Sequence, residues 1–215
     1  GCIVAPFIST QPYTLDDSEL QLHWSKEDLQ GYSCLEQQEA VADQDDDQEG
    51  TGFFNWHINE EHTHAILTFQ REGDPTQSLL INLHLEERHD VPRGLVSDRA
   101  LQVSSVFSPE TDEDYSGQGL ARSLYAVIAR CLDVLVVSDT HHHIPGKALW
   151  QSLAHNDGHP IGCLQVYIYN TQTKQLFRSE ETGEPLVYDG SNIPEDSIWS
   201  FNAHGHIVLV AKYTE

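Results

Sequence analysis

The sequence predicts an α/β (α+β) domain in which strands dominate and helices fall between them. Apolar, β-prone runs alternate with polar turns along most of the chain. Residues 100–139 have the order strand, glycine loop, helix, strand. The chain has 215 residues, of which 39% are hydrophobic, enough for a packed core. We therefore expect a single domain over residues 1–215, with an acidic N-terminal part (1–52) and a core (53–215).

The N-terminal part is predicted to hold short elements and one acidic loop. Residues 2–9 have the composition of a strand, and a helix start is predicted near Thr14. Residues 31–42 are expected to form a short helix. Residues 43–52 include three consecutive aspartates, but they lack the ligand spacing of a calcium loop. We expect this segment to be a solvated loop.

The core is predicted to alternate strands with two helices. The expected helices cover residues 119–132, with one apolar face, and 147–155. Long loops are expected over residues 89–99 and 177–194. The strands are predicted over residues 53–58, 65–71, 78–85, 100–107, 133–139, 162–169, 175–177 and 206–213, the first two as a hairpin around residues 59–61.

The glycine loop before the first of these helices is the most informative stretch. A helix that begins in such a loop directs several unpaired N–H groups, and the positive end of its dipole, at one point. This geometry suits a phosphate or diphosphate, and the small residues Gly117, Gly119 and Ala121 would let a ligand approach the backbone. The P-loop spacing and the third glycine of the dinucleotide fingerprint are both absent. A tight turn without a ligand remains the alternative.

Two motifs resemble a known family. The run Ser116-Gly117-Gln118-Gly119-Leu120-Ala121 resembles the acyl-CoA-binding loop of the GCN5-related N-acetyltransferases (GNAT), with the motif Arg/Gln-x-x-Gly-x-Gly/Ala. Gly119 and Ala121 match, and Ser116 stands at the Arg/Gln position. Residues 136–140 and 146–153 are similar to a GNAT-like subgroup common in bacteriophage genomes. The similarity covers roughly residues 78–213.

The resemblance implies a three-layer domain whose mixed central sheet is splayed between its fourth and fifth strands. Acetyl-CoA or another acyl-CoA would enter the split, with its pantetheine on the fourth strand and its diphosphate on the glycine loop. The residues expected to bind this cofactor are Val106, Phe107, Ser116, Gly117, Gln118, Gly119, Leu120 and Ala121.

The resemblance assigns no catalytic residue. The family often places an acidic Tyr on the helix after the fifth strand, where this chain has Trp150. Tyr125, Asp139 and His143 are candidate replacements, and Glu110 is a candidate base.

The charge of the chain bears on its partners. With 34 acidic and 11 basic side chains, the formal charge is -23. Such a surface repels nucleic acid and anionic membranes and suits a basic partner. No run of 18 apolar residues and no signal peptide is visible, so we expect no membrane association and a cytoplasmic location, in the host cell if the chain is phage-encoded.

Two functions follow as hypotheses. The first is an acyl-CoA-dependent N-acyltransferase that acts on an amine, such as a protein lysine. The second is a catalytically inactive, acidic, GNAT-like phage protein that binds and inhibits a basic host protein, as a mimic of nucleic acid. The sequence does not indicate an oligomeric state.

Histidine and cysteine offer a further chemistry. The pairs His62-x-His64 and His204-x-His206 would each place two imidazoles on one face of a strand, but no zincin helix motif occurs. We therefore expect no metal site. The four cysteines show no Cys-x-x-Cys pattern, and Cys131 and Cys163 are expected to be buried thiols.

Overall fold

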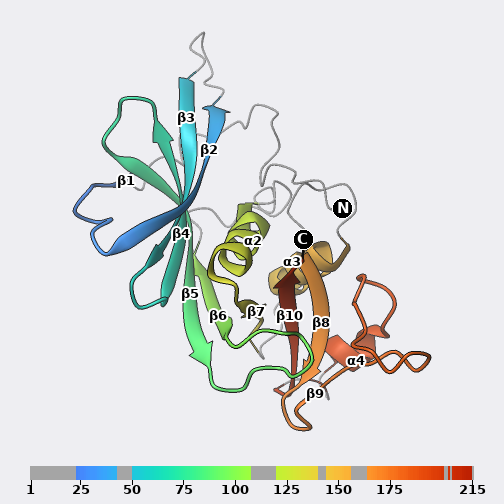
Figure 1. Cartoon of the computed structure of the whole chain (residues 1–215). Helices are drawn as coiled ribbons and strands as arrows, with labels where there is room; N and C mark the ends of the chain where they lie inside the picture. Colours follow the sequence, from blue (N-terminus) through green and yellow to red (C-terminus); the bar gives the residue numbers. More distant parts are fainter. Residues whose placement is uncertain are drawn as a thin grey trace.

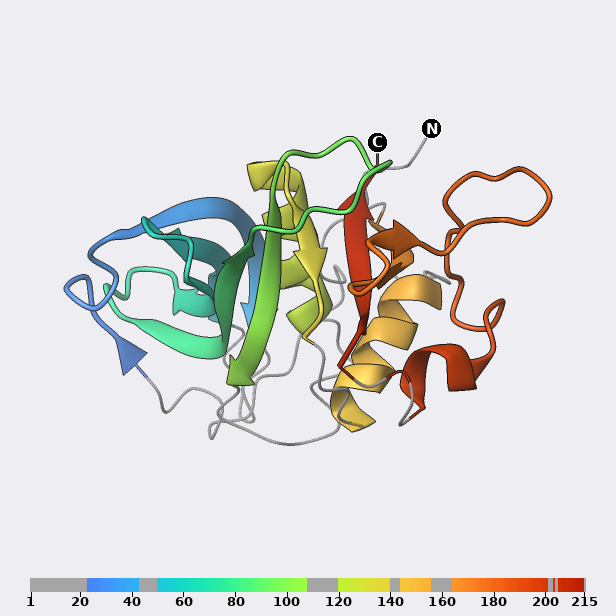
Figure 2. The same cartoon turned by 90° about the horizontal axis from the view of Figure 1, so that it is seen from below.

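The computed structural model describes residues 23–42, 50–107, 120–139, 144–155, 164–200, 203 and 205–214. These residues form a mixed α+β fold in which one curled, mixed sheet of ten strands wraps around few helices (Figures 1 and 2). No helix in these ranges is long and apolar enough to cross a membrane.

The strands are β1 (His23–Trp24), β2 (Tyr32–Ala42), β3 (Gly50–Asn59), β4 (His64–Arg71), β5 (Gln77–Arg88), β6 (Ala100–Phe107), β7 (Leu135–Val137), β8 (Leu164–Asn170), β9 (Gln175–Leu176) and β10 (Ile207–Tyr213). The helices are α2 (Leu120–Leu132), α3 (Ile144–His155) and α4 (Glu195–Trp199).

The strand order divides the sheet into two halves. The order is β2-β3-β4-β5-β6-β7-β10-β8-β9, with β1 paired to β5. Among the described strands, β6 and β7 form a parallel pair and every other pair is antiparallel. We call β1–β6 the N-terminal half and β7–β10 the C-terminal half. A parallel pair needs a crossover connection, which here contains α2.

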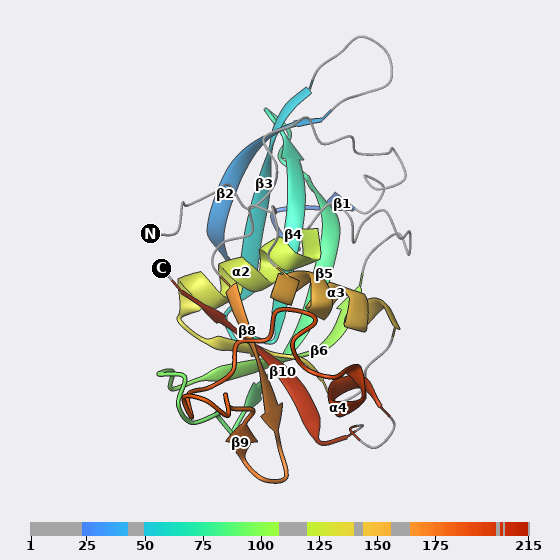
Figure 3. The ribbon, with the colours of Figure 1, turned by 90° about the vertical axis from the view of Figure 1, so that its right-hand side faces the viewer.

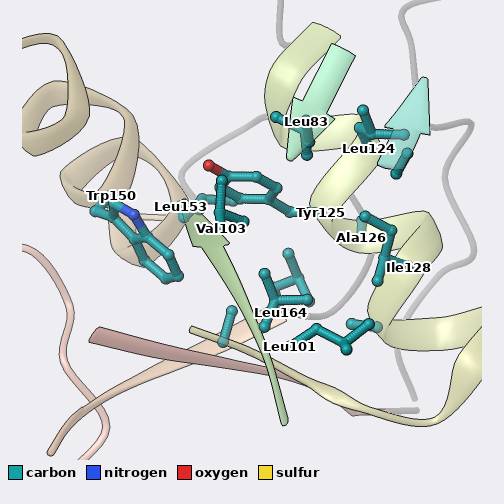
Figure 4. Close-up of a cluster of buried hydrophobic side chains, with 14 of the residues drawn as sticks. Leu83, Leu101, Val103, Leu124, Tyr125, Ala126, Ile128, Trp150, Leu153 and Leu164 are labelled. Carbon is teal, nitrogen blue, oxygen red and sulfur yellow. The ribbon is translucent and has the colours of Figure 1, made fainter. Parts of the chain in front are cut away.

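Helix α2 lies against the inner, concave face of the sheet (Figure 3). The apolar face predicted for it is correct, because Leu120, Leu124 and Ile128 are fully buried in the main core. Ser123 accepts a hydrogen bond of 3.0 Å from the Trp56 indole, which fixes α2 to β3. Helix α3 packs on the same core, since the rings of its Trp150 and of Tyr125 lie 5.6 Å apart (Figure 4).

The outer face of the C-terminal half is apolar. Leu95, from the loop over residues 89–99, packs on it, and the Tyr169 hydroxyl donates a 2.8 Å hydrogen bond to Asp90 in the same loop. The outer apolar cluster consists of Leu95, Ala100, Leu135, Val137, Tyr167, Tyr169, Leu176, Val208 and Val210. The loop thus serves as the cover of this face.

The outer face of the N-terminal half carries polar side chains instead. Asn55, His57 and Thr68 are buried, and all three contact Oε1 of Gln77, with Asn55 at 3.3 Å and His57 at 3.1 Å. Gln37 of β2 donates to Asn55 at 2.7 Å. We call these five residues the outer polar network. Buried polar groups need such partners, because an unpaired one is costly.

Most of the predicted elements within the described ranges are confirmed, with shifted ends. The helix predicted over residues 31–42 is wrong, since this segment is strand β2 and pairs with β3 from Tyr32 to Ala42. Its Glu, Gln and Ala residues favour helix in isolation, but pairing with a neighbouring strand overrides that preference. The acidic N-terminal part therefore contributes an edge strand to the sheet. The segments predicted over residues 2–9, near Thr14 and over 43–49 lie outside the described residues.

Three further expectations are corrected. Cys131 is exposed, because it falls in the last turn of α2, off the side that packs on the core; Cys163 lies outside the described residues. His62 does not share a strand face with His64, since it sits in the preceding turn with a φ of 56°. The strand predicted over 133–139 is shorter, Leu135–Val137.

Candidate functional site

The two halves of the sheet meet over a short seam. Strands β6 and β7 pair across three positions, which join residues 100–102 to residues 135–137. Strand β6 continues for five more residues to Phe107, and its last residues stay with β5 through the pairs Leu83 with Val106 and Asn82 with Phe107.

The chain beyond β7 follows the other half. Ser138 donates its N–H to the carbonyl of Leu209 in β10 at 2.9 Å, and its hydroxyl accepts the Leu209 N–H at 2.9 Å. One strand therefore stays with β5 while the chain after the other stays with β10. The sheet therefore separates between β6 and the chain after β7, at the carboxyl ends of these two parallel strands.

Helix α2 begins beside this part of the sheet. Val103 of β6 and Tyr125 of α2 belong to the same cluster of buried side chains, which the close-up draws (Figure 4). Leu120 and Ala121, two of the residues predicted to bind cofactor, form the first turn of α2. The first turn of any helix has N–H groups without an intrahelical partner, and the dipole is positive there. Because the Leu120 side chain is buried, a ligand could use only its amide.

The other predicted binding residues divide into two groups. Val106 and Phe107 are placed by their backbone pairing at the end of β6. Ser116, Gly117, Gln118 and Gly119 lie outside the described residues.

Arg122, also in the first turn of α2, was not singled out by the sequence. Its side chain is 3% exposed, and its Nε has no hydrogen-bond partner. Its Nη1 donates to the hydroxyl of Ser152 on α3. Burial lowers the pKa of this guanidinium. The signal that could have found it is its place directly after the glycine motif, although charged residues on an amphipathic helix are usually exposed.

Two of the four candidate acids and bases, Tyr125 and Asp139, lie within the described residues. Tyr125 is 2% exposed, and burial, followed by the Asp139 carboxylate, raises the pKa of its hydroxyl far above the usual range. This phenol stays protonated at neutral pH and holds its proton tightly. Asp139 is half-buried just after β7. His143 and Glu110 lie outside the described residues.

The histidines within the described ranges do not assemble a conventional metal site. His64 and His84 are paired across β4 and β5, and their rings stack with centroids 5.0 Å apart. The Ser104 hydroxyl lies 2.7 Å from Nδ1 of His84. In the part of the chain that the structure describes, no group of three or more His, Cys, Asp or Glu side chains could hold a metal ion.

Comparisons with protein-family models, with curated proteins and with solved structures give no match for this chain. Function therefore has to be inferred from the geometry described above and from the sequence motifs.

Proposed function

We propose that this chain is a GNAT-like N-acyltransferase that moves an acyl group from acetyl-CoA, or another acyl-CoA, to an amine such as a lysine side chain. The observation that carries the proposal is the parting of the parallel strands β6 and β7, with helix α2 in the crossover between them. The GNAT resemblance implies a mixed sheet splayed at this position, with the cofactor in the split.

The last residues of β6 have backbone N–H and C=O groups that do not pair with β7. Between Val103 and Phe107, β6 bonds to β5 on one side and has no β7 partner on the other. N–H and C=O groups in a strand point alternately to its two neighbours, so those that face away from β5 are not taken up by β7 and could bond to a ligand. The pantetheine arm of an acyl-CoA contains two amides and can pair with such a strand edge, as Val106 and Phe107 were predicted to do.

The reaction needs one bond made and one broken. The amine nitrogen attacks the thioester carbonyl carbon, a C–N bond forms, and the C–S bond breaks. The amine loses a proton to a base, and the departing thiolate takes up a proton from an acid or from water. In this proposal the Asp139 carboxylate attracts the cationic amine, and the Tyr125 hydroxyl, whose pKa Asp139 raises, is the candidate acid. The high pKa of Tyr125 makes it a weak acid, so we expect a modest rate.

The charge of the whole chain fits a basic substrate. A formal charge of -23 raises the local concentration of cationic groups and speeds their association at low salt. A lysine-rich protein segment in the cytoplasm, in the host cell if the chain is phage-encoded, is the substrate class that this field favours.

The test starts with cofactor binding. Native mass spectrometry of the purified protein should detect CoA, and acetyl-CoA should raise the melting temperature by about 5 °C or more at saturation. Ala121→Glu adds a negative charge to the first turn of α2 and should abolish this shift. Ala148→Glu adds the same charge at an exposed position of α3 and should leave the shift intact. If acetyl-CoA gives no shift in the wild type, the proposal fails.

Activity is measured separately, as release of free thiol from acetyl-CoA in the presence of a lysine-rich peptide. We expect thiol release to depend on the peptide and to fall as salt is raised from about 0.05 to 0.5 M, because screening weakens the attraction. Equal release with an acidic peptide would contradict the substrate class.

A second candidate function is a catalytically inactive, GNAT-like inhibitor of a basic host protein. The observations that favour it are the charge of -23 and the burial of Tyr125, which holds the proton of this hydroxyl tightly and makes it a poor acid for the departing thiolate. This candidate predicts tight, salt-sensitive capture of a nucleic-acid-binding host protein, competition by DNA for that host protein, and no thiol release. Thiol release with a lysine peptide would exclude it.

A further inference from the structure

We propose that His64 and His84 form an open metal site for a divalent transition-metal ion of the Zn(II), Ni(II) or Cu(II) type. The site lies on the outer face of the N-terminal half, because the adjacent residues Ala65 and Leu83 point into the main core on the inner face. It goes beyond the proposed acyl transfer and does not depend on it, since it rests on two imidazole rings and their hydrogen-bond partners.

The pairing of β4 with β5 brings the two histidines together. His64 and His84 are direct cross-strand partners, and the next position along carries the ladder bond from the Leu85 N–H to the Thr63 carbonyl, at 2.7 Å. The histidines therefore occupy a non-hydrogen-bonded position, where opposite side chains approach most closely. Their ring centroids lie 5.0 Å apart.

Each ring has a partner at Nδ1 that fixes its protonation. Nδ1 of His64 lies 3.3 Å from Oδ1 of Asn82, an oxygen that only accepts. Nδ1 of His84 lies 2.7 Å from the Ser104 hydroxyl, whose own proton can go to the His84 carbonyl oxygen at 3.2 Å. These partners assign the Nδ1–H tautomer to both rings and leave the Nε2 lone pairs bare. Metal-binding histidines have this arrangement, in which the second ring nitrogen donates to an acceptor.

The two Nε2 atoms are available to a ligand. Among the described residues, the hydrogen bonds of both rings are made by Nδ1, and both side chains are half-buried, so solvent reaches them. His57 on the same face differs, because its Nε2 already contacts Gln77 at 3.1 Å and Thr68 at 3.3 Å. The formal charge of -23 raises the concentration of cations near the surface.

The spacing of the rings fits a single ion. A metal–nitrogen bond of about 2.0–2.1 Å places the ion about 3.2 Å from each ring centroid. An N–metal–N angle of about 90–109° then requires centroids about 4.5–5.2 Å apart, which includes the observed spacing. The rings are inclined at 29°, so each must turn about its Cβ–Cγ bond to direct Nε2 at the ion. This torsion has broad minima in histidine.

The ligand type selects the metal. Imidazole nitrogen suits Zn(II), Ni(II) and Cu(II), whereas Mg(II) and Ca(II) prefer oxygen. Two protein ligands leave the other positions to water or to an incoming oxygen ligand, so we expect weaker binding than in a four-ligand structural zinc site. Sequence spacing does not reveal this pair, because the two histidines come from different strands.

The experiment titrates the metal-free full chain with Zn(II) and counts bound ions by calorimetry. His64→Gln and His84→Gln should each bind one ion fewer per chain than the wild type at about 0.1 mM Zn(II), because one imidazole alone holds the ion too weakly. His23→Gln, at an exposed position of β1, is the matched control and should bind as many ions as the wild type. Equal numbers of ions in all four proteins, or binding of Mg(II) at the same position, would overturn the proposal.

NMR of the wild type provides a test that does not need a variant to fold. With ¹⁵N-labelled histidine, the ring shifts of His64 and His84 should report the Nδ1–H tautomer in the metal-free protein. Zn(II) should then move their Nε2 resonances and leave that of His57 in place. An Nε2–H tautomer at either ring, or Nε2 resonances that stay unchanged up to about 1 mM Zn(II), contradicts the site.

A further variant tests the positioning role of Ser104. Ser104→Ala removes the acceptor at Nδ1 of His84 and keeps both imidazoles, so affinity for Zn(II) should fall by about tenfold. Ser97→Ala is the control, because its hydroxyl bonds to the Arg99 carbonyl outside the site. Unchanged affinity in Ser104→Ala would overturn the assignment of the tautomer on which the metal site depends.

Discussion

The two halves of the sheet bury their outer faces by different means. The outer face of the C-terminal half is buried in the outer apolar cluster, to which the loop over residues 89–99 adds Leu95 and the start of β6 adds Ala100. In the N-terminal half, the outer polar network connects β2, β3, β4 and β5 through side-chain hydrogen bonds, beside the buried apolar side chains Ile66 and Leu79. One sheet thus combines a face held by packing with a face held largely by directional contacts.

This difference predicts which substitutions and conditions destabilise each half. Apolar packing depends on volume and hardly on pH. A hydrogen-bonded network depends on each partner being present and in the right protonation state, because a single loss leaves several buried groups unsatisfied. Truncation of a buried side chain should therefore lower the stability of the C-terminal half most. Removal of a hydrogen-bond partner, or a change of pH, should act mainly on the N-terminal half.

The largest effect is expected from Leu135→Ala in the outer apolar cluster. Leu135 is 1% exposed in the middle of β7, so the truncation leaves a cavity and should cost about 2–5 kcal/mol of unfolding free energy. Urea unfolding followed by tryptophan fluorescence measures it. Val187→Ala, at a side chain 39% exposed, is the control and should cost less than about 0.5 kcal/mol. Equal costs at the two positions would show that the cluster is not the packed core of this half.

An intermediate effect is expected from Gln77→Leu in the outer polar network. The change removes the oxygen that Asn55, His57 and Thr68 share, and should cost about 1–3 kcal/mol because these buried groups lose a partner. Gln175→Leu, at an exposed position of β9, is the matched control and should be close to neutral. If Gln77→Leu were also neutral in urea unfolding, apolar contacts would dominate both faces.

The smallest effect is expected from pH. Burial lowers the pKa of His57 below its ordinary value of 6.5 in the folded state, although the hydrogen bond to Gln77 partly opposes this. Between the folded and unfolded pKa values, the unfolded chain binds a proton that the folded chain does not. Stability from His57 is thus complete above about pH 6.5 and is lost as the pH falls towards the folded pKa.

The measurement compares urea midpoints at about pH 7.5 and pH 5.5, above the range in which carboxylates titrate. The wild type should lose more stability over this interval than His57→Gln, which has no titrating ring. An identical loss in both proteins would assign the pH dependence to the other histidines.

The sequence predicts much of the sheet because its strands alternate or are rich in β-branched residues, as over residues 78–85 and 206–213. It also predicts α2, whose apolar residues repeat at helical spacing. It does not predict β2, since residues 32–42 have a helical composition and become a strand only through pairing with β3. The helical preference of a segment does not reveal that it will pair with another strand.

The candidate site was predicted less completely. Val106, Phe107, Leu120 and Ala121 could be placed at the end of a strand and the start of a helix, because both elements have clear patterns. Arg122 could not be found in this way, since its burial depends on α3, whose Ser152 is thirty positions further along. A helical pattern says which residues share a face, and it does not say what a second helix will cover.

The short seam between β6 and β7 has a mechanical consequence. Three residue pairs connect the halves through the sheet, whereas α2 touches β2 and β4 in one half and β7 and β10 in the other. Strand β7 also pairs with β10 over only two positions, so the sheet has few backbone contacts on both sides of β7, and α2 packs across this part of it. A cofactor inserted between β6 and β7 would change the distance between these strands, and with it the angle between the two halves of the sheet.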